Sequence, residues 1–78
     1  MIWDTFESLK VGDRLKPLGK VRSYPVVRIG KNFDRRVVYV CLNPIAVERG
    51  KEEPKEFGIF SAGSYDHKSH YINWEKVG

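Results

Sequence analysis

The amino-acid sequence predicts one mainly β domain over residues 1–78, a small five-stranded barrel preceded by a short helical turn. Two observations favour this fold class. Short runs of β-branched and aromatic residues alternate with turn-forming residues at a spacing typical of small barrels. A chain of 78 residues also forms a single hydrophobic core. A closed barrel would leave no unpaired edge, which an open five-stranded sheet would expose.

The first expected element is the helical turn over residues 3–10, with Phe6 and Leu9 facing inward. The first strand follows over residues 13–18. Pro17 indicates an edge strand or the end of the strand, because proline has no N–H to donate to a sheet ladder. A polar loop then leads to the second strand.

The strongest local pattern is a hairpin. Residues 25–31 and 36–42 are rich in β-formers, and a polar segment with turn residues separates them. Alternation along the first of these strands should place Val27 and Ile29 inside and Arg28 in solvent. The last six residues of the second strand are all apolar, which indicates a strand buried on both faces or one near the middle of a curled sheet.

Two further strands are expected in the second half of the chain. They cover residues 56–62, with Phe57 and Ile59 on one face and Phe60 on the other, and residues 71–77. The segments between the strands are a short strand extension at 45–47, a charged loop at 48–55 and a polar loop at 63–69.

Two segments resemble a known superfamily. Lys10-Val11-Gly12-Asp13-Arg14-Leu15, which follows an aromatic-bearing turn, resembles the opening of SH3-like barrels of the KOW and Tudor type. The closing segment Tyr71-Ile72-Asn73-Trp74-Glu75-Lys76-Val77 resembles the last strand of that fold. The resemblance implies an architecture and no particular function, because many unrelated functions occur on this fold.

Composition indicates the environment of the protein. Cys41 is the one cysteine, so no internal disulfide can form, and we expect a reducing, cytoplasmic location. No apolar run approaches the ~20 residues that span a bilayer, and we expect no membrane association. The first ten residues mix acidic and aromatic side chains, unlike a signal peptide.

Positive charge is concentrated in the first half of the chain. Between Lys10 and Arg36, nine basic residues face two acidic ones, Asp13 and Asp34, which gives 9 − 2 = +7. Such a surface favours nucleic acid, because cations contact phosphates and aromatic rings stack on bases. The predicted binding residues, from a loop and hairpin over residues 20–36, are Lys20, Arg22, Tyr24, Arg28, Lys31, Arg35 and Arg36.

An acidic protein surface is the alternative partner for the same cations. Phe33, Tyr39 and Tyr65 would then serve as aromatic anchors. Phe33 distinguishes two arrangements of the hairpin tip. An exposed ring would suggest insertion into a partner's pocket, whereas a turn that folds back would place the ring over the end of the barrel.

Enzyme and metal signatures are weak. His67, His70 and Cys41 could bind zinc, but a structural zinc site takes four ligands and no second cysteine is present. Cys41 lies in the most apolar strand, where a thiol is usually buried and inert. No phosphate-binding glycine loop or nucleophile motif occurs. We therefore expect a non-catalytic binding module without a metal or cofactor.

Overall fold

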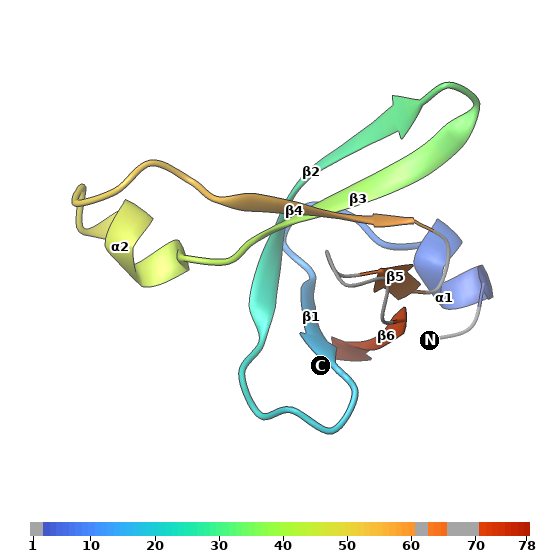
Figure 1. Ribbon diagram of the computed structural model, residues 1–78, viewed down its shortest axis with the longest axis horizontal. Helices are drawn as coiled ribbons and strands as arrows, with labels where there is room; N and C mark the ends of the chain where they lie inside the picture. The colour runs from blue at the N-terminus through green and yellow to red at the C-terminus, as the bar shows by residue number, and fades with distance from the viewer. Residues whose placement is uncertain (1–2, 61–62, 66–70) are drawn as a thin grey trace.

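A computed structural model describes residues 3–60, 63–65 and 71–78, with side chains described for all of these except 63–65, 71 and 72 (Figure 1). The chain is mainly β and carries two short helices, which confirms the predicted mainly β class and the N-terminal helical turn. The elements are α1 (Trp3–Glu7), β1 (Arg14–Pro17), β2 (Tyr24–Asn32), β3 (Arg35–Cys41), α2 (Pro44–Glu48), β4 (Glu56–Phe60), β5 (Gly63–Tyr65) and β6 (Tyr71–Val77).

All strand pairs are antiparallel, and each strand pairs with the next one along the chain. The last strand, β6, also pairs with β1, where Arg14 lies opposite Val77 and Pro17 lies opposite Trp74. The longest ladder joins β2 to β3, from Val26 and Val40 to the hairpin turn. Figure 1 shows this hairpin as a long arm that extends away from β1 and β6.

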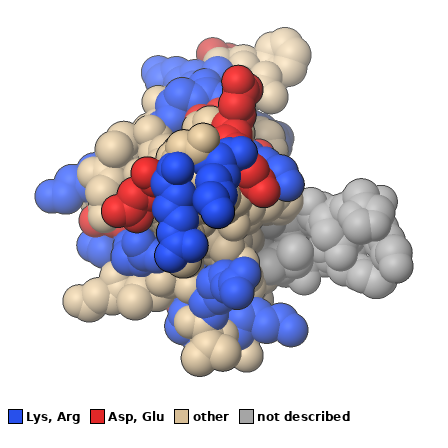
Figure 2. Space-filling view, turned by 90° about the vertical axis from the view of Figure 1, so that its left-hand side faces the viewer, with Lys and Arg blue, Asp and Glu red and all other residues tan. Residues whose placement is uncertain are grey.

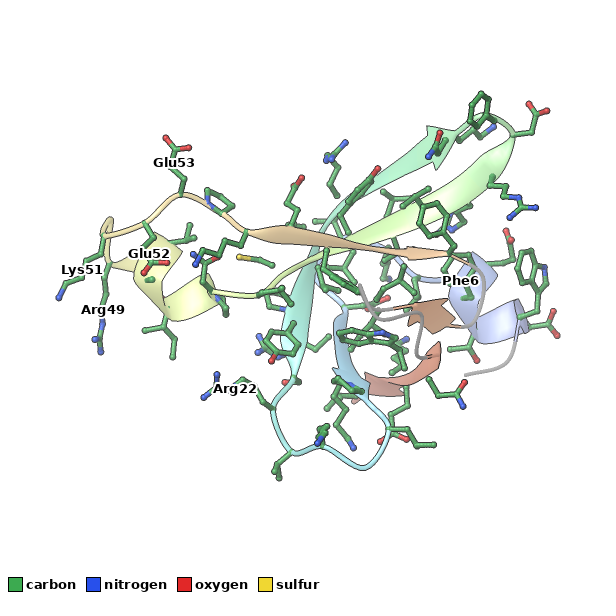
Figure 3. All side chains as sticks on the ribbon, viewed as in Figure 1. Phe6, Arg22, Arg49, Lys51, Glu52 and Glu53 are labelled. Carbon is green, nitrogen blue, oxygen red and sulfur yellow. The ribbon has the colours of Figure 1, made fainter. Side chains whose placement is uncertain are left out.

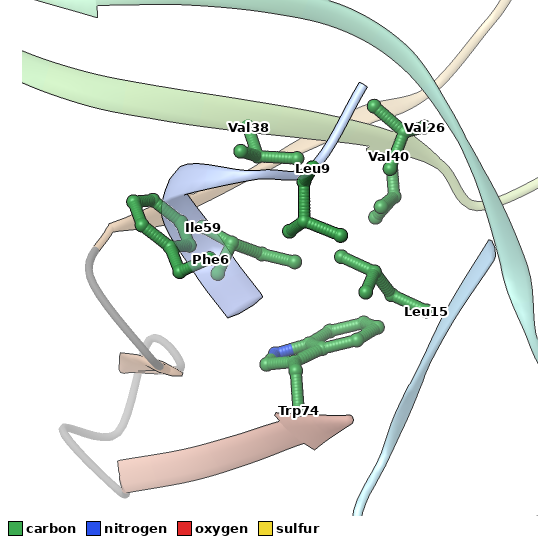
Figure 4. Packing of buried hydrophobic residues seen from close by; sticks show 8 residues of the cluster. All are labelled: Phe6, Leu9, Leu15, Val26, Val38, Val40, Ile59 and Trp74. Atoms are coloured by element: carbon green, nitrogen blue, oxygen red, sulfur yellow. The ribbon is translucent and has the colours of Figure 1, made fainter. Parts of the chain in front are cut away.

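Side chains from both the helical turn and the strands form the core (Figure 4). Phe6 and Leu9, at 0% and 2% exposure, cover one side of it, as predicted. Burial of such apolar side chains contributes roughly 1.5–3 kcal/mol each relative to exposure. The remaining members of the cluster come from five strands and are Leu15, Val26, Val38, Val40, Ile59 and Trp74.

A β-bulge changes the alternation of β2. Val26 lies opposite Val40 and Arg28 lies opposite Tyr39, which leaves Val27 as an extra residue without a partner on β3. Val26 is therefore buried, and Val27 is 39% exposed. The prediction that Val27 faces inward is wrong for this reason. Arg28 faces solvent, as expected.

The expectation that β3 is buried on both faces is confirmed. Val38 and Val40 face the core, while Val37 and Cys41 are buried on the opposite face. Tyr39 lies on the same outer face, and its ring lies between glycines of the two neighbouring strands, β2 and β4.

Two glycines make room for the ring of Tyr39. A Cβ on Gly58 of β4 would lie 3.4 Å from Tyr39 Cε1 and 3.3 Å from Val37 Cγ1. A Cβ on Gly30 of β2 would lie 3.7 Å from Tyr39 Cε2. The two edges of the ring therefore lie beside glycines of both neighbouring strands, and an aromatic ring is a known way to cover strand glycines.

Two predicted connections are wrong. Residues 45–47, expected to extend a strand, belong to α2, which begins with Pro44 at a position where proline is favourable. Residues 63–65, expected in a loop, form β5 and pair with β6. Within the described parts of the chain, no helix has the length and apolar character needed to cross a membrane.

The charged loop after α2 is anchored by one side chain, that of Asn43. Its Oδ1 accepts hydrogen bonds from the Lys55 N–H at 2.9 Å and from the Cys41 thiol at 3.3 Å. Its Nδ2 donates to Glu52 Oε2 at 2.9 Å and to the Glu53 carbonyl at 3.0 Å. Both ends of this connection are thereby held at the end of β3.

Candidate nucleic-acid interface

The predicted basic residues form two groups at opposite ends of β2. Lys20 and Arg22 lie in the β1–β2 loop beside Tyr24, and Lys31 and Arg35 lie at the hairpin. Because β2 has nine residues, and a strand rises about 3.3 Å per residue, its ends are up to about 26 Å apart. The expected single patch over the loop and hairpin is therefore two separate surfaces.

The first surface is a cleft between the hairpin and α1, called here the hairpin cleft. Its volume is about 670 Å³. Positively and negatively charged side chains line the cleft, together with exposed aromatic rings. The lining residues are Trp3, Glu7, Ile29, Gly30, Lys31, Asp34, Arg35, Arg36 and Phe60.

Two of its cations are free of acidic partners in the part of the chain that the structure describes. Lys31 and Arg35 are exposed and form no ion pair there. Arg36 is partly buried: its Nη2 donates to the Leu9 carbonyl, and its Nε is buried without a hydrogen-bond partner among the described residues. Glu7 and Asp34 offset part of this charge, so the five charged lining side chains sum to 3 − 2 = +1.

Three aromatic rings lie at or beside this cleft. Trp3 is 53% exposed and Phe60 is 40% exposed, and neither was singled out as a binding residue from the sequence. Phe33, at the hairpin tip, is 94% exposed. The alternative in which the turn folds back to cover the barrel with Phe33 is therefore wrong.

The turn that carries Phe33 is tight and unusual. Asn32 lies opposite Arg35, so Phe33 and Asp34 alone connect the two strands. Phe33 has a φ of 57°, in the left-handed region that bulky residues avoid. An exposed aromatic residue thus occupies a position where glycine or asparagine would cost less.

Arg28, a predicted phosphate ligand, makes intramolecular contacts on the outer face of the sheet. Its Nη2 lies 2.9 Å from Glu56 Oε1, and its guanidinium stacks 3.9 Å above the centroid of the Tyr39 ring. The hydrogen bond to Glu56 raises the pKa of Arg28 above its usual value. Tyr39, a predicted protein anchor, is thus covered by Arg28 on one ring face, and the edges of its ring lie beside strand glycines.

The second surface is a cleft of about 390 Å³ between the β1–β2 loop and α2, called here the loop–α2 cleft. It brings together Arg22 and Tyr24, both predicted, and Arg14, which was not. The full lining is Arg14, Arg22, Ser23, Tyr24, Leu42, Asn43, Pro44, Ile45 and Ala46. A neighbouring cleft of about 380 Å³ continues past Arg22 to Lys20.

The face that carries α2 is shown in Figure 2, where Lys and Arg side chains are interspersed with Asp and Glu. The side chain of Tyr65 and residues His67 and His70 lie outside the described side chains. Among the side chains that are described, no three His, Cys, Asp or Glu residues lie close enough to hold a metal ion. Cys41 is buried.

Comparisons with protein-family models, with curated proteins and with solved structures found no match to this chain.

Proposed function

We propose that this protein is a non-catalytic module that binds single-stranded nucleic acid at the hairpin cleft. The observation that carries the proposal is that two exposed aromatic rings, Trp3 and Phe60, line one cleft with two cations that have no acidic partner in the described structure. A third exposed ring, Phe33, lies on the hairpin turn between these two cations in the sequence. Lys31 and Arg35 would contact phosphates, and the rings would stack on bases.

Single strands fit this surface better than a duplex does. Base–aromatic stacking requires unpaired bases and contributes roughly 1–3 kcal/mol per base. The cleft sums to only +1, so phosphate contacts alone provide little affinity. We further propose that the architecture is an SH3-like barrel, which is supported by the antiparallel order β1 to β6 and the return of β6 to β1.

A fluorescence-anisotropy titration tests the proposal. The probes are a fluorescein-labelled 12-mer of oligo(dT), its oligo(rU) counterpart and a 12-base-pair duplex, each at 50 and 200 mM salt. Tighter binding of the single strands is expected. Replacing Lys31 and Arg35 with glutamine should reduce the slope of log K against log salt by about 1.4, since each lost phosphate contact on a single strand contributes about 0.7.

The matched control is Arg49→Gln with Lys51→Gln. These two cations are exposed, carry the same charge and lie beyond α2, away from the hairpin (Figure 3). The control should leave the affinity nearly unchanged. Absence of binding at 50 mM salt, or equal losses in both double variants, would contradict a site at the hairpin cleft.

A protein partner remains the second candidate function, favoured by the near-complete exposure of Phe33. Phe33 is an exposed aromatic ring on a turn flanked by two cations, Lys31 and Arg35. Such a residue is typical of interface anchors that insert into an apolar pocket of a partner. In this case the titration would show no nucleic-acid binding. A partner that co-purifies after nuclease treatment would be lost in Phe33→Asn and retained in the control variant.

A further inference from the structure

We infer that the loop–α2 cleft is a second binding site, which takes a carboxylate of an acidic protein segment together with a neighbouring aliphatic side chain. This inference does not depend on the proposed nucleic-acid function, because the two clefts lie at opposite ends of β2 and share no lining residue. It rests on the charges, the shape and the wall composition of the cleft.

The charged side chains that line the loop–α2 cleft are all positive. Among the side chains that the structure describes, Arg14 and Arg22 are the charged ones that line it, and none of the lining residues is acidic. Neither arginine forms an ion pair within the described structure, whereas nearby Lys16 is paired with Glu75 at 2.5 Å. An anionic group entering the cleft would therefore meet two guanidinium groups without first displacing an internal carboxylate.

Arg14 is held in place before any ligand arrives. Its Nε donates to Ser23 Oγ at 3.0 Å, and its Nη2 donates to the Ser23 carbonyl at 3.1 Å. These bonds fix the guanidinium against the end of the β1–β2 loop. Arg22 is exposed and extends from that loop toward the side of the molecule on which α2 lies (Figure 3). A pre-positioned cation costs less entropy on binding, and the planar guanidinium matches a carboxylate in two parallel hydrogen bonds.

The opposite wall is aliphatic. Ile45 is 62% exposed and Leu42 is 37% exposed, and Pro44 and Ala46 complete the wall. Asn43, which lies between them in sequence, is fixed by hydrogen bonds on both sides of its amide. The wall is thus an ordered apolar surface facing two cations, which is complementary to an acidic residue next to an aliphatic one.

A nucleotide fits this cleft less well. Its one aromatic lining residue is Tyr24, which is partly buried and packs edge-on against Trp74 with ring centroids 6.1 Å apart. Flat stacking of a base would need a free ring face of the kind present in the hairpin cleft. An extended acidic segment could also continue past Arg22 into the neighbouring cleft, which Lys20 lines.

The test is a titration of ¹⁵N-labelled protein followed by backbone amide shifts. The probes are N-acetyl-leucine, its uncharged amide N-acetyl-leucinamide, and uridine 5′-monophosphate. N-acetyl-leucine should shift the amides of Ser23, Leu42 and Ala46 in a saturable manner, with a dissociation constant on the order of millimolar, as its size allows. The amide should shift them little, since it cannot form the charge-assisted bonds.

Arg22→Gln should weaken the binding of N-acetyl-leucine about tenfold, the usual effect of losing one charged hydrogen bond. Arg22 is the preferred variant because it makes no hydrogen bond within the described structure, whereas Arg14→Gln would also release the loop. Lys10→Gln is the control: the Lys10 side chain is exposed and is not part of either cleft lining, so this variant should bind as the wild type does.

Three results would overturn the inference. They are no saturable shift with N-acetyl-leucine, an equal response to its amide, and tighter binding of uridine 5′-monophosphate at the same amides. Because the described linings of the two clefts have no residue in common, failure here leaves the oligonucleotide result intact. Failure of the oligonucleotide titration likewise says nothing against the loop–α2 cleft, because the N-acetyl-leucine titration tests that cleft on its own.

Discussion

Replacement of Phe33 by asparagine should stabilise the protein. A non-glycine residue in the left-handed region costs roughly 1–2 kcal/mol, a cost that asparagine largely avoids. Since the side chain of Phe33 is 94% exposed, its removal gives up little buried surface, worth about 0.3 kcal/mol for a ring of roughly 200 Å². The expected net gain is about 1 kcal/mol, which raises the Tm of a domain of this size by about 4–8 °C.

Thermal unfolding followed by circular dichroism measures this gain, and urea denaturation supplies an independent value. The control is Val21→Asn: Val21 is 100% exposed and has a negative φ, so its Tm should stay within about 2 °C of the wild type. A Tm for Phe33→Asn at or below that of the control would refute the strain argument.

The same substitution should weaken binding at the hairpin cleft. Loss of one stacking ring costs roughly 1–3 kcal/mol, or about 5- to 150-fold in affinity for the single-stranded probe. A variant that is more stable but binds more weakly would indicate that the aromatic residue is kept at a strained position for function. Equal or higher affinity in the variant would exclude a binding role for the ring.

The remaining predictions concern stability and are measured by urea denaturation. Gly58→Ala should lose about 1–2 kcal/mol, because its Cβ would press on β3 side chains at 3.3–3.4 Å. Gly30→Ala meets only an ordinary 3.7 Å contact and should gain about 0.5 kcal/mol, so a similar loss in both variants would contradict the packing of Tyr39. Asn43→Ala should lose about 2 kcal/mol through its hydrogen bonds to the charged loop, while Asn73→Ala, which removes no described side-chain bond, should change little.

Much of the fold could be predicted because alternation along a strand is a local property. The burial of Leu15, Ile59 and Trp74 follows from it, and so does the outward position of Phe60. The prediction failed at Val27, where one extra residue in β2 reverses the alternation. Nothing in the local sequence marks a bulge at this valine, because the bulge is defined by the pairing with β3.

The helix α2 was missed although its start signal was present. Asn43 and Pro44 are favourable at the start of a helix, but Ile45 and Val47 favour strands and were interpreted as a strand extension. Only the hydrogen bonds that close the following loop on Asn43 explain why the chain turns there.

The candidate site was predicted in its charges but not in its geometry. Lys31 and Arg35 were identified from composition, whereas Trp3 and Phe60 joined them through α1 and β4, which lie far apart in the sequence. Arg14 likewise reaches the loop–α2 cleft from β1. Such groupings depend on tertiary structure, so a count of charges along the chain cannot reveal them.

The pairing of β1 with β6 has a consequence for folding kinetics. Closing a loop from Arg14 to Val77 costs on the order of 4 kcal/mol in chain entropy, whereas the β2–β3 turn needs only two residues. The hairpin and β4 should therefore assemble before the rate-limiting barrier, and β1 and β6 should join after it. In φ-value measurements, Val38→Ala should slow refolding, while Trp74→Phe should mainly accelerate unfolding.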